Sequence, residues 1–473
     1  MKKSLFLSVL SVLIYHLSYS QSEYASFEVP FKNAISISSI PDEKGNICYG
    51  FRFEKDYYFI LLSKNKEVLF REKIHETSRV ENYFCGTISN ENQFVFFNRY
   101  NTDNTKLIAH IIYKDNPKYE EVKNIRFLDR KKEEFIEIIN TCKEFYIVSV
   151  SKKTGNIYLT SFDSGQHYEK RVFHPDMTDI YKHFKKSLFS FSRTNLINPI
   201  FKAYFSNKIY KDEEKFYFTF KKFPNKLITE KNYTEILSLN WETSYCEYTY
   251  FVNIYGKSKE SYNSTIYKDR FFQITILPTL FDLTIYDLKT FNLITSYNYQ
   301  HKDYLELMSS PLIKKNLGDI SVKELNYTKN TLEVTDKLSK GLISICANKL
   351  NRELVELEIG SFSKNGVNIP LIVMGGIMGG AIGGAIAGAM LESYDMGYSN
   401  YFRSVLSYPE MEIATSNNTT SINEKLQRFI TEIMKKNIKI SGETFYQITD
   451  NIAHYGYINK KEKKFVVVEF DNN

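Results

Sequence analysis

The sequence has few of the residues that most metal and redox sites require. It holds eight histidines, one tryptophan and five cysteines, and the cysteines are Cys48, Cys85, Cys142, Cys246 and Cys346. No two cysteines form a C-x-x-C pair, and no H-x-x-x-H pair occurs. Zinc ligands and redox thiols usually stand at such spacings. The sequence therefore predicts no metal and no cofactor, and the cysteines are expected to be small buried residues.

Catalytic motifs are missing too. The chain has neither a G-x-S-x-G nucleophile elbow nor a glycine-rich phosphate loop at the start of a helix. The net charge is +7, but the lysines alternate with acidic residues and form no concentrated patch. This pattern favours solvated strand faces over a nucleic-acid surface. The sequence thus favours a non-catalytic protein with no nucleic-acid partner.

Residues 1–20 have the layout of a secretory signal peptide. Lys2 and Lys3 precede an apolar run from residue 5 to residue 14, and Ser18 and Ser20 stand three and one positions before Gln21. The run is shorter than the roughly 20 residues that a spanning helix needs. We expect an exported protein, periplasmic, outer-membrane-associated or extracellular.

The remainder, residues 21–473, is rich in aromatic and β-branched residues in short runs separated by polar turns. This rhythm indicates many short antiparallel strands. It recurs in segments at 46–74, 82–115, 139–173, 215–223 with 235–255, 270–299, 341–362 and 444–470. In the first two segments, Cys48 and Cys85 both lie nine residues before the next strand, which suggests a shared register. Such repeats predict a mainly β fold, a β-propeller of about seven blades, with a pair of β-sandwich domains as the alternative.

The two ends of the mature chain suggest how such a ring would close. The chain finishes on an apolar strand, KKFVVVEF, and an isolated strand at residues 26–31 precedes the first full segment. We expect the N-terminal strand to cover the unpaired edge of the last blade.

One hairpin resembles a known motif. The stretch SFDSGQHY resembles the Asp-box turn of bacterial sialidase-type propellers through Ser161, Asp163, Gly165 and Tyr168. The resemblance implies a tight hairpin in which Gly165 takes a positive φ, Asp163 accepts hydrogen bonds from turn amides and Tyr168 packs back. Asp-boxes are structural turns, so the motif favours the fold. It leaves a carbohydrate-active, sialidase-like propeller hydrolase as the alternative function, although the arginines are too sparse to form that family's carboxylate-binding cluster.

An uncharged, glycine-rich run occupies residues 371–391, within an insertion expected at 365–398. Its glycines recur every four residues and resemble the glycine-zipper segments of bacterial envelope proteins, whose small residues let helices approach closely. The strands expected on either side, at 354–362 and 401–413, look like neighbours in one blade. If they pair, both ends of the run lie on the same side of any membrane, and the run is a looped excursion. The residues expected to contact a membrane or partner are Ile372, Val373, Met374, Gly376, Ile377, Met378, Gly380, Ile382, Gly384, Ile386, Gly388 and Met390. A packed or flexible structural loop and a true membrane span are the alternatives.

One amphipathic helix is expected at 421–437. It opens with a capping box, Ser421 and Glu424, and its apolar face would comprise Ile422, Leu426, Phe429, Ile430, Ile433 and Met434. We expect it to pack on a blade. Together these features predict a non-catalytic binding or scaffold protein of a bacterial cell envelope, with an envelope protein, a membrane surface or a glycan as its partner.

Overall fold

The computed structural model describes residues 21–471, apart from 77–83, 101–102, 104, 142–143, 177–179, 187–188, 194–199, 201–202, 206, 223–231, 256–260, 317–322, 326–328, 364–396, 415–420 and 450. The described residues form seven β-sheets, with few helices beside them. The prediction of a mainly β fold is confirmed.

The first three sheets have four antiparallel strands each, in chain order. Sheet 1 consists of β2 (Ser36–Pro41), β3 (Ile47–Phe53), β4 (Asp56–Leu62) and β5 (Val68–His75). Sheet 2 consists of β6 (Gly86–Ser89), β7 (Gln93–Arg99), β8 (Lys106–Tyr113) and β9 (Tyr119–Arg126). Sheet 3 consists of β10 (Glu133–Asn140), β11 (Phe145–Ser151), β12 (Ile157–Phe162) and β13 (Tyr168–Phe173).

Sheets 4 and 5 continue the series. Sheet 4 has five strands, β14 (Phe189–Arg193), β15 (Asn207–Asp212), β16 (Lys215–Lys222), β17 (Asn232–Asn240) and β18 (Cys246–Asn253). Its β14 runs parallel to β15, an exception to the antiparallel pairing that the sequence predicted. Sheet 5 consists of β19 (Tyr262–Tyr267), β20 (Arg270–Leu277), β21 (Leu280–Asp287) and β22 (Leu293–Gln300).

The last two sheets depart from simple chain order. Sheet 6 has the order β24-β23-β27-β26-β25, and its strands are β23 (Leu312–Asn316), β24 (Lys323–Leu325), β25 (Leu342–Lys349), β26 (Leu354–Ser363) and β27 (Tyr398–Ser407). Sheet 7 has the order β1-β30-β29-β28, and its strands are β1 (Gln21–Glu28), β28 (Ile440–Thr449), β29 (Ile452–Asn459) and β30 (Lys464–Asp471). Among the described residues, three helices accompany the sheets: α2 (Ile180–Lys186), α3 (Thr331–Leu338) and α6 (Ile422–Lys435).

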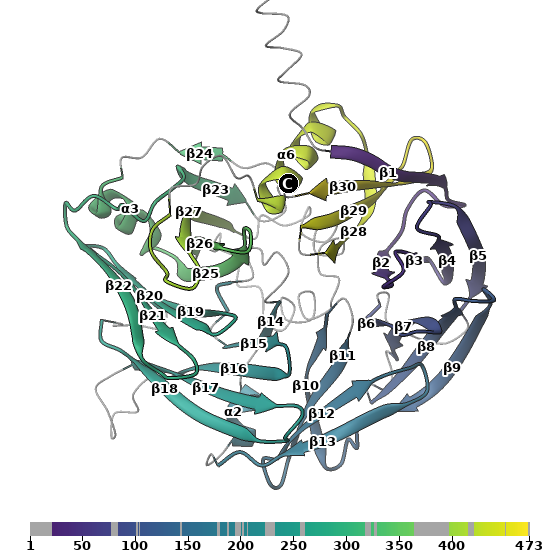
Figure 1. Cartoon of the computed structure of the whole chain (residues 1–473), viewed down its shortest axis with the longest axis horizontal. Helices are drawn as coiled ribbons and strands as arrows, with labels where there is room; N and C mark the ends of the chain where they lie inside the picture. The colour runs from purple at the N-terminus through teal and green to yellow at the C-terminus, as the bar shows by residue number, and fades with distance from the viewer. Residues whose placement is uncertain are drawn as a thin grey trace, which may run out of the picture.

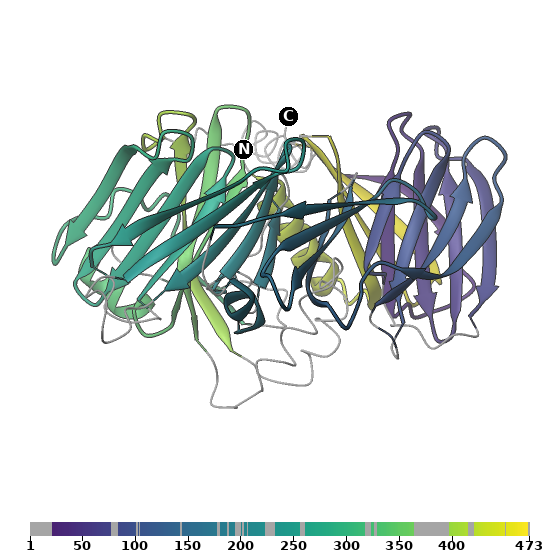
Figure 2. The ribbon, with the colours of Figure 1, turned by 90° about the horizontal axis from the view of Figure 1, so that it is seen from below.

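The sheets follow one another around a common centre (Figure 1), with their strands running between the two faces of the molecule (Figure 2). Strands β2, β6, β10 and β14 lie side by side, as do β2 and β28. Such an arrangement differs from the pair of β-sandwiches that the sequence left open.

Apolar clusters lie between consecutive sheets. One cluster joins sheet 7 to sheet 1. Five further clusters join sheets 1 and 2, 2 and 3, 3 and 4, 4 and 5, and 5 and 6. Burial of this apolar surface is the main force that holds the sheets against each other. Between sheets 6 and 7, the part of the chain that the structure describes has no such cluster. Arg403 of β27 instead forms an ion pair with Glu424 of α6, with Nη1 and Oε2 3.0 Å apart.

The N-terminal strand closes the last sheet as expected. β1 pairs antiparallel with β30, and Phe27 lies opposite Phe465. The ring of Phe27 packs 5.3 Å from that of Phe465, centroid to centroid. The strand begins at Gln21 and ends at Glu28, earlier than the predicted range of 26–31. The first and last strands of the described residues therefore share one sheet, and β1 covers an edge of β30 that would otherwise be unpaired.

The register inferred from the cysteines is wrong. Cys48 lies within β3, the second strand of sheet 1, whereas Cys85 lies just before β6, the first strand of sheet 2. The equal spacing therefore aligns different strands of the two sheets. Cys48, Cys85 and Cys346 are buried thiols, as predicted, and Cys246 is only partly buried. Cys142 lies outside the described residues.

The amphipathic helix is found where the sequence predicts it. Ser421 caps α6 by accepting a hydrogen bond from the N–H of Glu424, with Oγ and N 3.3 Å apart. Ile422, Ile430 and Ile433 are buried against β29 and β30. Met434 is 48% exposed, which corrects its place on the predicted apolar face. In the described residues, no helix has the length and apolar character needed to cross a membrane.

Candidate functional site

The Asp-box-like stretch forms the predicted hairpin, but not with the predicted contacts. Ser161 and Tyr168 lie on the paired strands β12 and β13. Gly165 does not adopt a positive φ. The turn amides of residues 166 and 167 donate to Oγ of Ser164. The side chain of Asp163 is exposed to solvent. The resemblance to the Asp-box is therefore one of sequence and hairpin position, without its internal bonding.

Gly165 is needed for a different reason. A Cβ at this position would lie 2.4 Å from the Cδ1 of Ile111 on the neighbouring sheet. The turn thus packs closely on sheet 2 because glycine has no side chain. Tyr168 packs back as predicted, with its ring 5.4 Å from that of Phe162, and its hydroxyl donates to the carbonyl of Arg126.

The predicted contact residues from Ile372 to Met390 lie outside the described residues. The strands that flank them are described. β26 and β27 pair along their whole length, and Ser363 lies opposite Tyr398. The expectation that the flanking strands are neighbours is confirmed. Gly397, with φ +138°, returns the chain to the sheet so tightly that a Cβ would lie 2.3 Å from the carbonyl oxygen of Ser363.

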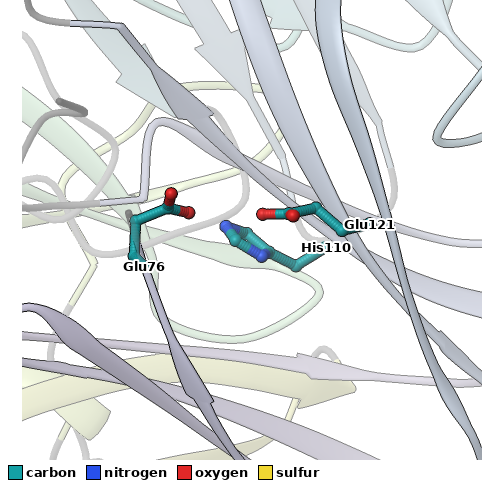
Figure 3. A group of neighbouring side chains, drawn as sticks. All are labelled: Glu76, His110 and Glu121. Atoms are coloured by element: carbon teal, nitrogen blue, oxygen red, sulfur yellow. The ribbon is translucent and has the colours of Figure 1, made fainter. Parts of the chain in front are cut away.

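A buried polar cluster that the sequence did not predict lies between sheets 1 and 2. It consists of Glu76, His110 and Glu121, and Figure 3 shows the imidazole pointing between the two carboxyl groups. One possible ligand atom from each residue lies within 4.8 Å of those of the other two. We call these residues the Glu–His–Glu cluster.

The strands place each member of the cluster. His110 and Glu121 are direct cross-strand partners on β8 and β9, so their side chains share a face. That face of β8 packs on sheet 1, because Ile108 and Ile112 on either side of His110 belong to the apolar cluster between the two sheets. Glu76 directly follows β5, and its N–H donates to the carbonyl of Lys55 at 3.0 Å. The cluster therefore spans the boundary between two sheets.

Aromatic residues surround the imidazole. The His110 ring lies 4.3 Å from the ring of Tyr57 and 5.6 Å from that of Phe59, measured between centroids. Its Nδ1 is 2.9 Å from the hydroxyl of Tyr119. His110 is fully buried, and its Nε2 has no hydrogen-bond partner among the described residues. A buried polar atom without a hydrogen-bond partner lowers the stability of the fold, so this nitrogen is a candidate to bind a ligand.

Charges at the cluster are partly balanced by a lysine. The ammonium of Lys123 lies 2.9 Å from Oε2 of Glu121 and 3.8 Å from Oε1 of Glu76. Burial raises the pKa of Glu121, a hydrogen bond to Lys123 lowers it, and the Glu76 carboxylate raises it. Burial, together with the positive charges of Arg52 and Lys123, lowers the pKa of His110 to about 3. The imidazole is therefore neutral at physiological pH.

A second buried charged group, the sheet 6 cluster, consists of Glu356, Glu358, Arg403 and Glu424. The Nε of Arg403 lies 3.9 Å from Glu356 and 3.7 Å from Glu358, measured to Oε1 in each case. The side chains of these two glutamates are 5% and 2% exposed. Burial raises the pKa of Glu356 to about 7, and Arg403 opposes that rise. The cluster lies where sheet 6 meets α6, and its burial favours a structural role over contact with a substrate.

Searches against known proteins identify no family. No family model and no curated protein matches the sequence. Among solved structures, the chain is similar to the WD40 domain of SCAP from fission yeast, at 9% identity and a TM-score of 0.32, over 69% of this chain and 80% of that one. It is also similar to a prolyl endopeptidase, at 8% identity and a TM-score of 0.33, over 93% of this chain and 46% of that one. A third similarity is to Synechocystis apocarotenoid oxygenase, at 8% identity and a TM-score of 0.28, over 57% of this chain and 62% of that one. Similarities at this level carry no argument about what the chain binds or does.

Proposed function

We propose that the chain is a seven-bladed β-propeller that serves as a non-catalytic scaffold or binding protein of a bacterial cell envelope. Support for the propeller comes from the chain order of the sheets around one centre and from the neighbouring strands β2, β6, β10 and β14. The pairing of β1 with β30 supports closure through the last blade. Export to the envelope is proposed from the signal-peptide pattern of residues 1–20.

Docking through residues 371–391 is the second part of the proposal. The observation that carries it is the pairing of β26 with β27, in which Ser363 lies opposite Tyr398. The chain leaves and re-enters one sheet at neighbouring positions, so both ends of the insertion lie on the same side of any membrane. A single crossing is incompatible with this pairing, and the run is too short to cross twice. We infer that the apolar residues of this run contact a membrane surface or an envelope protein.

The direct test is fractionation of cells that express the full chain or a chain lacking residues 371–391. We expect the full chain in the membrane fraction and the deletion variant in the soluble envelope fraction or the medium, because the deletion removes the apolar contact. A matched control replaces Gly376, Gly380, Gly384 and Gly388 with leucine. That variant stays apolar but loses the smooth glycine face.

The control separates the two kinds of partner. Retained membrane association in the leucine variant indicates insertion into lipid, and its loss indicates close packing against a protein helix. Unchanged fractionation of the deletion variant contradicts docking through this run.

One observation bears on the alternative of a carbohydrate-active hydrolase. Arg403 converges with Glu356, Glu358 and Glu424, and such hydrolases combine carboxylates with arginines. Glu356 and Glu358 are buried, so their carboxylates are not open to a sugar arriving from solvent. We therefore retain the scaffold as the proposal.

A further inference from the structure

We propose that Glu76, His110 and Glu121 bind one divalent transition-metal ion. Ligands that share an ion at 2.0–2.2 Å lie at most about 4.4 Å apart. The candidate ligand atoms of the three residues already lie within 4.8 Å of one another. Three ligands of one ion cannot all lie opposite one another and stand roughly 3.3–3.8 Å apart, so the side chains would have to move by up to about 1 Å to coordinate it. This proposal is independent of the docking run.

The buried imidazole is the observation that distinguishes this cluster from an ordinary pair of carboxylates. Nε2 of His110 has no hydrogen-bond partner in the part of the chain that the structure describes, and it points between the two carboxyl groups (Figure 3). Nδ1 faces the hydroxyl of Tyr119 at 2.9 Å. If Nδ1 carries the proton and donates it to this hydroxyl, the lone pair of Nε2 is free to bind a metal. Metal-binding histidines are commonly oriented in this way by a partner on the other ring nitrogen.

Lys123 is the competitor that the ion must displace. Its ammonium lies within ion-pair distance of both Glu76 and Glu121, so it balances their charge when no ion is bound. The lysine side chain is 38% exposed, whereas that of Glu76 is fully buried. A long, half-exposed lysine can turn its ammonium into solvent at little cost. A divalent cation between the two carboxylates would then put two positive charges where the lysine ammonium supplied one.

The donor set indicates the class of metal. One imidazole nitrogen and two carboxylate oxygens suit Zn²⁺, Mn²⁺ or Fe²⁺, because imidazole disfavours Mg²⁺ and Ca²⁺ and no thiolate is present in the cluster. Three protein ligands leave at least one position for water or another ligand. Since Glu76 belongs to sheet 1 and the other two residues to sheet 2, a bound ion would also fasten the two sheets together.

Calorimetric titration of the chelator-treated full chain with Zn²⁺, and separately with Mn²⁺, tests the proposal. We expect the wild type to bind about one metal ion per chain, and E76Q and E121Q each to weaken its affinity at least tenfold. We also expect Zn²⁺ to raise the melting temperature of the wild type and not of these variants. Mg²⁺ serves as the probe that should not bind.

Two variants serve as controls. H454Q changes another buried histidine, whose Nε2 lies 2.9 Å from Glu469 and whose Nδ1 lies 2.9 Å from Tyr446, and it should leave Zn²⁺ binding within twofold of the wild type. K123M removes the competing ammonium and should strengthen binding. A wild-type chain that binds neither Zn²⁺ nor Mn²⁺ overturns the proposal, as does equal binding by wild type and a folded E121Q.

Discussion

At the scale of single residues, the polar groups buried between sheets are the least predictable part of the molecule. His110 and Glu121 face each other because the β8–β9 hairpin aligns them. Glu76 comes from a different sheet. No sequence spacing relates a residue after β5 to a residue on β8, so the cluster could not be predicted from the sequence.

Glu356 provides a test of the sheet 6 cluster. Burial raises the pKa of its carboxyl to about 7, so the folded protein keeps a proton that the unfolded chain loses above its ordinary pKa of 4.5. The stabilisation that this proton provides is complete below that ordinary value and is lost as the pH rises to about 7. We expect the loss to be on the order of 3 kcal/mol, since each pKa unit corresponds to about 1.4 kcal/mol.

The measurement compares wild type with E356Q by chemical denaturation between pH 4.5 and 7.5. The difference between the two proteins isolates this carboxyl from His110 and other titrating groups. E356Q should gain stability relative to wild type as the pH rises. A difference that stays constant with pH would contradict the assigned environment of Glu356.

At the scale of elements, local sequence patterns predicted the positions of strands and of α6 correctly, whereas the proposed alignment of one repeat with the next was wrong. Alternating apolar residues located the strands, and the capping pattern located α6, because both signals are written within a few residues. The cysteine register failed because it compared one strand of sheet 1 with a different strand of sheet 2. The sequence attributed the glycine at position 165 to a turn with positive φ. In the structure a glycine is needed there because a side chain would clash with Ile111, which is distant in sequence.

The N-cap of α6 gives an element-scale prediction. Ser421 accepts the N–H of Glu424 and is itself buried, at 4% exposure. S421A should lower the free energy of unfolding by about 1 kcal/mol, the usual cost of losing such a cap. S421D preserves the capping acceptor but adds a charge near Glu356 and Glu424, so S421N is the better matched control. Equal losses in S421A and S421N would show that the cap contributes nothing.

At the scale of the whole molecule, the pairing of the N-terminal strand with the last sheet was predicted, whereas the contacts between sheets 6 and 7 were not. An isolated N-terminal strand and a C-terminal strand without a following partner together predicted that β1 would join sheet 7. In the part of the chain that the structure describes, α6 and an ion pair stand at the boundary between sheets 6 and 7, and no sequence pattern distinguished this boundary from the apolar ones. The two strands that precede and follow the insertion, β26 and β27, are paired neighbours in sheet 6.

The central claim is that residues 371–391 serve for docking and that the sheets fold without them. The most direct measurement is co-sedimentation of the purified chain, residues 21–473, with bacterial envelope membranes, beside the variant that lacks residues 371–391, with melting temperatures recorded for both. We predict that the full chain sediments with the membranes, that the variant stays in the supernatant, and that the two melting temperatures agree within a few degrees. Sedimentation of both proteins alike, or a variant that is unfolded under the same conditions, would contradict the account.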